Sequence, residues 1–258
     1  MIPEIIATAA AAAAGTAVAI HGIFASRSCF WGPLTWRGDD SPPARVALTF
    51  DDGPHPEATP RALDLLAKAG ARAAFFLVGM QAEKWPAIVK RIVDEGHLIG
   101  NHSWSHSKSG GYQFTGYWES EIVRTASLLE QIAGVRPAWF RPPYVVKQWH
   151  MHRAVRRCGN TMITYTERAF DGVATTPEAI VARLVPRATA GAILTLHDGV
   201  IPGTPRPIEP TLAALPNVIE GLRARGLAIA PLDELIAAAP YAAAARAKAA
   251  PSRIHSGA

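Results

Sequence analysis

The sequence predicts an α/β fold made of repeated strand-then-helix units, closed or nearly closed into a barrel. From Val46 onward, short apolar runs typical of buried strands alternate with amphipathic runs typical of helices. A glycine follows several of the amphipathic runs, as is common where a helix ends. Repeated units of this kind place parallel strands side by side through right-handed crossovers. The number of units favours a barrel over a doubly wound sheet.

The predicted elements follow one another in strand–helix pairs along most of the chain. Strands are predicted at residues 46–50, 74–78, 98–101, 138–141, 161–164, 193–196 and 227–230. Helices are predicted at residues 60–69, 82–95, 117–133, 151–158, 177–187, 212–225 and 232–238. Because parallel strands share one direction, the residues just after each strand are expected at one end of the barrel, where such folds place their active sites.

The composition fits one large α/β domain or two small ones, and it does not favour nucleic-acid binding. The chain has 258 residues and a formal net charge of +5. Three positive charges, Arg246, Lys248 and Arg253, follow the last acidic residue, so the body carries about +2 (5 − 3). The spacing of Cys29 and Cys158 matches no zinc or redox motif.

Residues 1–27 are predicted to form a hydrophobic helix that anchors the protein to a membrane. Residues 5–26 include no Asp, Glu, Lys or Arg, and a helix of this length can span a hydrocarbon core of about 30 Å. A cleaved secretory signal and an ordinary Ala-rich soluble helix remain alternatives. The positive-inside rule favours a cytoplasmic body, because Arg27, Arg37 and Arg45 follow the run and a single acid precedes it.

The rest of the chain divides into three segments by composition. Residues 28–43 contain several prolines and glycines and are predicted to be an irregular linker. Residues 44–238 hold the alternating units and are predicted to be the folded domain. Residues 239–258 are an Ala-rich basic tail, for which frayed helix or disorder is expected.

Two adjacent acids, Asp51 and Asp52, follow the first predicted strand directly. The dipeptide Gly53-Pro54 after them marks a turn. Acids at the carboxyl end of a buried strand lie where α/β folds place their active sites. An Asx turn with two solvated carboxylates is the alternative for an isolated motif of this kind.

A pair of histidines, His102 and His106, follows the third predicted strand. On a helical turn, a spacing of four residues puts both imidazoles on one face, where they can hold one metal ion. Two histidines and one carboxylate leave open positions on the metal, as in a catalytic site. Zn²⁺ suits this ligand set, and cobalt, nickel or manganese fit the same geometry.

Two further charged or titratable residues stand at strand ends, Arg141 and His197. Two prolines after Arg141 restrict the backbone beyond it. An unperturbed histidine titrates near pH 6.5, which suits it to donate a proton to a leaving group. Taken alone, a surface arginine and a structural histidine are the alternatives.

The strand ends thus carry Asp-Asp, His-x₃-His, Arg and His in that order, a combination that resembles the polysaccharide deacetylase family. This family is also known as the NodB-homology group or carbohydrate esterase family 4. The resemblance covers roughly residues 44–236, and its matching segments are Thr49–Pro54, His102–His106, Arg141–Tyr144 and Leu194–His197.

The resemblance implies a distorted (β/α)7-8 barrel of the NodB-homology type that removes acetyl groups from sugars with a divalent metal. The implied metal ligands are Asp52, His102 and His106. Asp51 would be the general base, with Arg141 keeping it ionised by charge pairing. The implied contacts of the substrate are with Pro142 and Tyr144, the backbone N–H of the latter holding the oxyanion, and His197 would protonate the leaving group.

The sequence departs from the family pattern at three places. Val145 stands where the third motif has glycine, and Thr195 stands where the fifth has leucine, so a more polar acyl pocket is expected. The usual Asp-Trp of the fourth motif is absent. Phe170 is the candidate replacement for its tryptophan, and Asp171 is the candidate to contact His197 as the family aspartate does.

Three functions are consistent with these features. The first is metal-dependent removal of acetyl groups from N-acetylated glycans, such as peptidoglycan or a surface polysaccharide. The second is deacylation or deformylation of a lipid-linked sugar at the membrane, favoured by the predicted N-terminal helix. The third is an inactive carbohydrate-binding module on the same fold. By the resemblance the domain would lie outside the cytoplasm, whereas the charge bias favours the cytoplasm, so the membrane side stays open.

Overall fold

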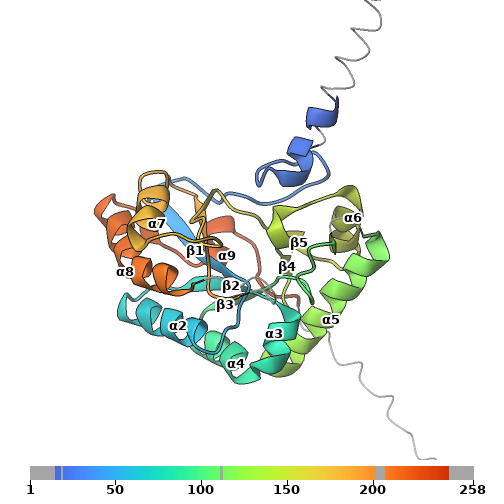
Figure 1. Cartoon of the computed structure of the whole chain (residues 1–258), viewed down its shortest axis with the longest axis horizontal. Helices are drawn as coiled ribbons and strands as arrows, with labels where there is room; N and C mark the ends of the chain where they lie inside the picture. The colour runs from blue at the N-terminus through green and yellow to red at the C-terminus, as the bar shows by residue number, and fades with distance from the viewer. Residues whose placement is uncertain (1–14, 19, 111–112, 201–206, 244–258) are drawn as a thin grey trace, which may run out of the picture.

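The protein folds around one parallel β-sheet with helices packed outside it (Figure 1). A computed structural model describes residues 15–18, 20–110, 113–200 and 207–243. Its strands are β1 (Arg45–Asp51), β2 (Ala73–Leu77), β3 (Leu98–Asn101), β4 (Trp139–Phe140), β5 (Thr161–Met162), β6 (Glu167–Arg168), β7 (Ile193–His197) and β8 (Ala228–Ile229). The predicted α/β class is therefore confirmed.

The strands form an open half-barrel, not the closed barrel that was expected as one alternative. Their order is β5-β4-β3-β2-β1-β7-β6, and β8 pairs with β1. Within the described part of the chain, β5 and β6 do not pair with each other. The segment before β1 lies in this region instead, because Thr35 bridges Ile163 and Arg37 bridges Ala192. The strands β4, β5 and β6, two residues each, also offer few hydrogen bonds for closure.

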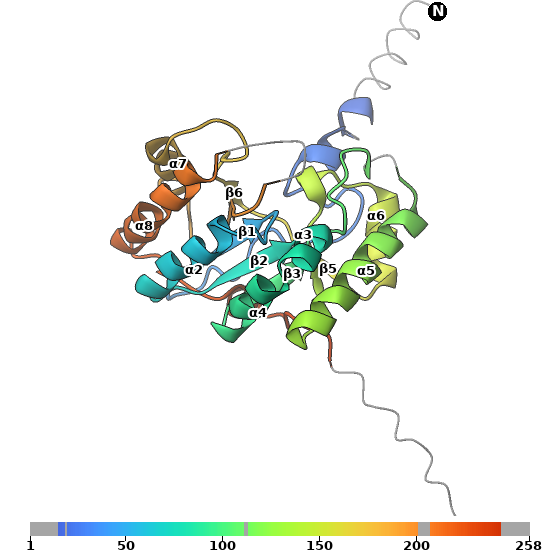
Figure 2. The same cartoon turned by 60° about the horizontal axis from the view of Figure 1, so that its bottom comes forward.

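Helices cover the outside of the half-barrel, as the two views show (Figures 1 and 2). They are α2 (Ala58–Lys68), α3 (Gly79–Lys84), α4 (Pro86–Asp94), α5 (Thr115–Ala133), α6 (Trp149–Arg157), α7 (Pro177–Leu184), α8 (Glu209–Ala224) and α9 (Leu232–Ile236), with the 3₁₀ turn η2 (Pro143–Val145). The single helix predicted at 82–95 is two helices. The break precedes Pro86, because a proline disfavours helical backbone at the residue before it.

The alternation of β1 decides which of its side chains reach the inside of the half-barrel. Val46, Leu48 and Phe50 pack into the main hydrophobic core with residues of α2, α4, α7 and α8. Thr49 and Asp51 alternate with them and therefore point to the opposite face of the sheet. The side chains of this inner face meet at the carboxyl ends of the strands.

The segment that precedes the sheet also contacts the domain. Residues 15–18 and 20–24 are helical, and the backbone N–H of Lys147 donates to the carbonyl oxygen of Ile23 at 3.1 Å. Among the described residues, none of the helices has the length and apolar character needed to cross a bilayer. Residues 1–14 and 19 lie outside the described part, so the anchor stays a prediction.

The beginning of the predicted tail is packed as well. The N–H of Ala138 donates to the carbonyl oxygen of Pro240 at 2.8 Å, and the N–H of Ile99 donates to the hydroxyl of Tyr241 at 3.3 Å. Residues 244–258 lie outside the described part, so the rest of the tail stays a prediction. Both cysteines are free thiols.

Candidate active site

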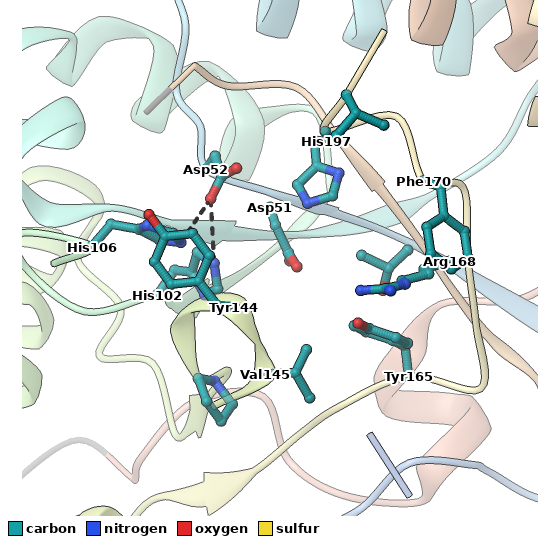
Figure 3. A pocket seen from close by; sticks show the side chains of 14 residues that line it. Asp51, Asp52, His102, His106, Tyr144, Val145, Tyr165, Arg168, Phe170 and His197 are labelled. Carbon is teal, nitrogen blue, oxygen red and sulfur yellow. Dashed lines mark ion pairs between the residues drawn. The ribbon is translucent and has the colours of Figure 1, made fainter. Parts of the chain in front are cut away.

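The four strand-end motifs converge on one cavity of about 320 Å³ at the carboxyl edge of the sheet (Figure 3). The register explains this convergence, because Asp51 on β1 is paired with His197 on β7. Asn101, next to His102, is paired with Phe140, next to Arg141. The residues that line the cavity are Asp51, Asp52, His102, His106, Pro142, Tyr144, Val145, Tyr165, Arg168, Phe170, Gly172, Val173, Thr195 and His197.

Three buried side chains, Asp52, His102 and His106, form a potential metal centre. A ligand atom from each lies within 4.8 Å of the others. The Oδ1 atom of Asp52 is 3.4 Å from Nε2 of His102 and 3.1 Å from Nε2 of His106. The Nδ1 atom of His102 is 2.8 Å from the carbonyl oxygen of Arg141. If Nδ1 carries the proton that this contact favours, Nε2 keeps its lone pair for a metal.

The loop that carries the two histidines is irregular, so the helical turn assumed for their spacing is wrong. Ser103 and His106 both have positive φ angles, 68° and 49°. Polar side chains fix this path: Asn101 accepts a hydrogen bond from the N–H of Ser103, and Ser103 accepts one from the N–H of His106. Glu121 of α5 accepts two more from the backbone of the loop. The loop is thus held by hydrogen bonds that helix periodicity does not reveal.

The directions of the pKa shifts in the Asp-His-His group favour the binding of a cation. Burial raises the pKa of Asp52, but its close contacts with the rings of His102 and His106 outweigh this effect and bring the pKa well below its usual range. Burial lowers the pKa of His106, and its contacts with Asp52 oppose this effect. One carboxylate oxygen and two imidazole nitrogens are a donor set that a divalent transition metal takes.

A buried ion pair joins Asp51 to Arg141. The Nη1 atom of Arg141 donates to Oδ1 of Asp51 at 2.7 Å, and the arginine side chain has no solvent exposure. The same nitrogen donates to the hydroxyls of Thr49 and Thr195, while the ring of Phe76 lies 3.9 Å from the guanidinium carbon. Thr49 was missed from the sequence, although its position two residues before Asp51 places it on the same face.

The predicted contact between Asp171 and His197 is present. Oδ1 of Asp171 is 2.6 Å from Nδ1 of His197, and Oδ2 accepts the backbone N–H of the same histidine at 2.9 Å. Thr211 of α8 donates to Oδ2 as well. Asp171 therefore fixes both the backbone and the ring of His197.

The loop after β4 places Pro142 and Tyr144 against the cavity, as predicted from the third motif. The ring of Tyr144 lies 4.5 Å from the ring of His106, centroid to centroid. Tyr144 and Val145 both have left-handed backbone, with φ of 55° and 59°. Glycine adopts this conformation far more readily than valine does. The third motif of the family has glycine at the position of Val145, which suits this backbone conformation.

Thr195 was expected to make the acyl pocket more polar, but its hydroxyl is hydrogen-bonded to other residues. The hydroxyl of Thr195 lies 3.0 Å from that of Thr49 and accepts from Arg141. Sequence reasoning did not select Tyr165, Arg168 or Val173 as site residues, although all three line the cavity. Strands β5 and β6 are so short that no periodic signal indicates which of their residues face inward.

Comparison with known proteins identifies the family. Residues 38–163 match the family model described as polysaccharide deacetylase. A peptidoglycan-N-acetylglucosamine deacetylase of Bacillus cereus is 33% identical over 183 residues, which are 71% of this chain and 65% of that relative, slightly under two thirds. A chitooligosaccharide deacetylase of Azorhizobium caulinodans is 33% identical over 199 residues, 72% of this chain and 92% of that relative. The chain belongs to the polysaccharide deacetylase family.

Solved structures agree with this assignment. The Bc1960 peptidoglycan N-acetylglucosamine deacetylase has a TM-score of 0.74 and 30% identity, over 81% of this chain and 95% of that one. A mutant of a CE4 family pseudoenzyme with restored enzymatic activity has a TM-score of 0.69 and 26% identity, over 78% and 70% of the two chains. The resemblance inferred from the motifs is confirmed, and the chain is a hydrolase of the polysaccharide deacetylase class.

Proposed function

We propose that the protein is a metal-dependent deacetylase of N-acetylated glycans, with peptidoglycan or chitin-like oligosaccharides as its substrate class. The observation that carries this proposal is the meeting of three groups in one cavity: the Asp-His-His ligand set, Asp51 paired with Arg141, and His197 paired with Asp171. The similar deacetylases of peptidoglycan and chitooligosaccharides support the substrate class.

The residues present fit a divalent metal. Asp52, His102 and His106 would hold it through one oxygen and two nitrogens, and Zn²⁺ suits this set, with cobalt, nickel or manganese as alternatives. When bound, such an ion acts as a Lewis acid that polarises an acyl oxygen and makes water more acidic.

Asp51 is placed to act as the general base. Its carboxylate lies in the cavity beside the ligand set (Figure 3) and is held by Arg141 at 2.7 Å. The arginine binds one oxygen with a fixed positive charge and so orients the carboxylate. It can then accept a proton from the water that attacks the acetyl carbon.

His197 is placed to act as the general acid. Its ring approaches the cavity from the β7 side, whereas His106 and Tyr144 border it on the other side (Figure 3). Because Nδ1 is bonded to Asp171, the proton given to the leaving amine would come from Nε2. Base and acid therefore act on the acetyl group from different strands of one edge.

The retention of both proton-transfer groups argues against an inactive carbohydrate-binding module. Binding a glycan needs neither the buried Asp51–Arg141 pair nor the Asp171–His197 pair. Burying charged groups costs desolvation free energy, which a module that only binds glycan has no reason to bear. The lipid-linked sugar and the membrane as a partner stay predictions from the N-terminal sequence.

Acetate release tests the proposal. The protein loaded with Zn²⁺ would be given N-acetylglucosamine oligomers, beside the variant Asp51→Asn. We expect release by the wild-type protein and a loss of about 100-fold or more in the variant, since the base is removed while the fold and the ligand set stay. Equal release by both proteins would exclude Asp51 as the base. Binding of oligomers without any release would favour the inactive module.

A further inference from the structure

A cation that the proposed chemistry does not use, Arg168, lines the wall of the cavity opposite the metal ligands. Figure 3 shows its guanidinium directed into the cavity toward Asp51, beside Tyr165 and Phe170. The Asp-His-His set lies across the cavity. The guanidinium and the metal ligands therefore face the same cavity from different sides.

The sheet register explains why Arg168 faces the cavity. On β6 it is paired with Thr195 of β7, which is paired in turn with Thr49 of β1. Residues in register on parallel strands point to the same face, and Thr49 points inward to Arg141. Neighbouring strands lie about 4.8 Å apart and residues rise about 3.3 Å along a strand, so the backbone of Arg168 is roughly 8 Å from that of His197.

The guanidinium is held in place by an aromatic ring, and among the described residues no carboxylate forms an ion pair with it. Its central carbon lies 3.9 Å from the ring centroid of Phe170. Phe170 itself has φ of 54°, a strained conformation for a residue other than glycine. Arg183 braces the same loop by donating to the carbonyl oxygen of Ala169. The structure thus orients a charge toward the cavity without neutralising it there.

We propose that Arg168 binds an anionic group of the substrate, a carboxylate or a phosphate carried on the sugar next to the acetylated one. This inference rests on the proposed function and narrows its substrate class to acidic glycans. A guanidinium recognises either anion through two parallel hydrogen bonds. Arg168 and His197 line the same cavity, and their backbones are roughly 8 Å apart, so one bound oligosaccharide can contact both side chains.

The test compares three oligosaccharides of equal length. One is a neutral N-acetylglucosamine oligomer, one alternates with N-acetylmuramic acid and carries lactyl carboxylates, and one bears a terminal phosphate monoester. The variants are Arg168→Gln and Arg168→Lys, with Arg187→Gln as a control that removes the same charge from an exposed position outside the cavity. KM and kcat for deacetylation are measured with each.

We expect Arg168→Gln to raise KM for an acidic oligomer about 10- to 100-fold and to change the neutral one less than about threefold. Arg168→Lys should recover part of the loss, because it keeps the charge but not the bidentate geometry. Arg187→Gln should leave all three substrates unaffected. Whichever acidic oligomer shows the selective loss identifies the anion as carboxylate or phosphate.

Equal effects of Arg168→Gln on neutral and acidic oligomers would overturn the inference and leave the proposed function intact. Binding is measured as well, by calorimetry, on the Asp51→Asn protein with and without Arg168→Gln. Equal affinity of this protein for neutral and acidic oligomers would also overturn the inference, whether or not turnover is seen. If the wild-type protein released acetate from none of the three oligomers, the result would instead count against the proposed function.

Discussion

His197 depends on one neighbouring residue, Asp171, for its orientation. Both oxygens of Asp171 are used, one on the imidazole and one on the backbone N–H of His197. A carboxylate at this distance stabilises the protonated imidazole and fixes which nitrogen carries the proton in the neutral form. The site therefore needs Asp171 even though the residue does not line the cavity.

The variant Asp171→Asn should lower kcat by about 100-fold and change KM little. The fall in activity on the basic side should also begin at a lower pH, because the charged histidine loses its counter-charge. The pH dependence of kcat measures both effects. Thr211→Val is the matched control, since it removes another contact of Asp171 and leaves the contact with His197. An unchanged pH profile in Asp171→Asn would remove Asp171 from the mechanism.

At the scale of elements, a buried lysine connects the N-terminal segment to the loop of the active site. Lys147 follows η2 closely, is fully buried, and donates from Nζ to the carbonyl oxygen of Ala25 at 2.5 Å. Burial lowers its pKa from 10.5 to about 8. Between these values the unfolded chain holds a proton that the folded protein has released, so stability rises with pH across this window.

We expect the wild-type protein to gain up to about 3 kcal/mol of unfolding free energy from this group between pH 8 and pH 10.5. Lys147→Met should lose this gain, because it carries no titrating group. Denaturant unfolding at several pH values gives the difference between the two proteins. Lys84→Met, at an exposed position of α3, is the control and should follow the wild-type curve. A constant difference between wild type and Lys147→Met across the window would contradict the account.

Elements with strong local signals were predicted well from the sequence. The apolar run at 46–50 became β1 (Arg45–Asp51), and the run at 193–196 became β7 (Ile193–His197). Because the motif residues follow the ends of predicted parallel strands, the sequence predicted that they lie at one edge of the sheet. The structure brings them together there. Long buried strands are predictable because their apolar runs are hard to place anywhere else.

Features that depend on tertiary contacts were not predicted. The position of Thr35 beside Ile163, which helps to leave the sheet open, has no local signal. The inward direction of Arg168 depends on its register with Thr195, and two-residue strands carry no periodicity. The path of the loop around His102 depends on hydrogen bonds from distant side chains such as Glu121.

At the scale of the whole molecule, the half-barrel serves to bring separate strand ends to one place. Asp52 comes from the end of β1, the two histidines from the loop after β3, Arg141 from just beyond β4 and His197 from β7. The central claim of this account is that these parts make one metal-dependent hydrolytic centre. Its ligands are the most direct point at which to test that claim.

The decisive measurement is metal content and acetate release determined together. Protein stripped with a chelator would be titrated with Zn²⁺, beside His106→Ala. We expect activity to return in proportion to bound metal and to level off at about one equivalent per chain, while His106→Ala binds weakly and stays inactive, because one of three ligands is lost. Full activity in metal-free protein, or tight binding and normal turnover in His106→Ala, would contradict the account.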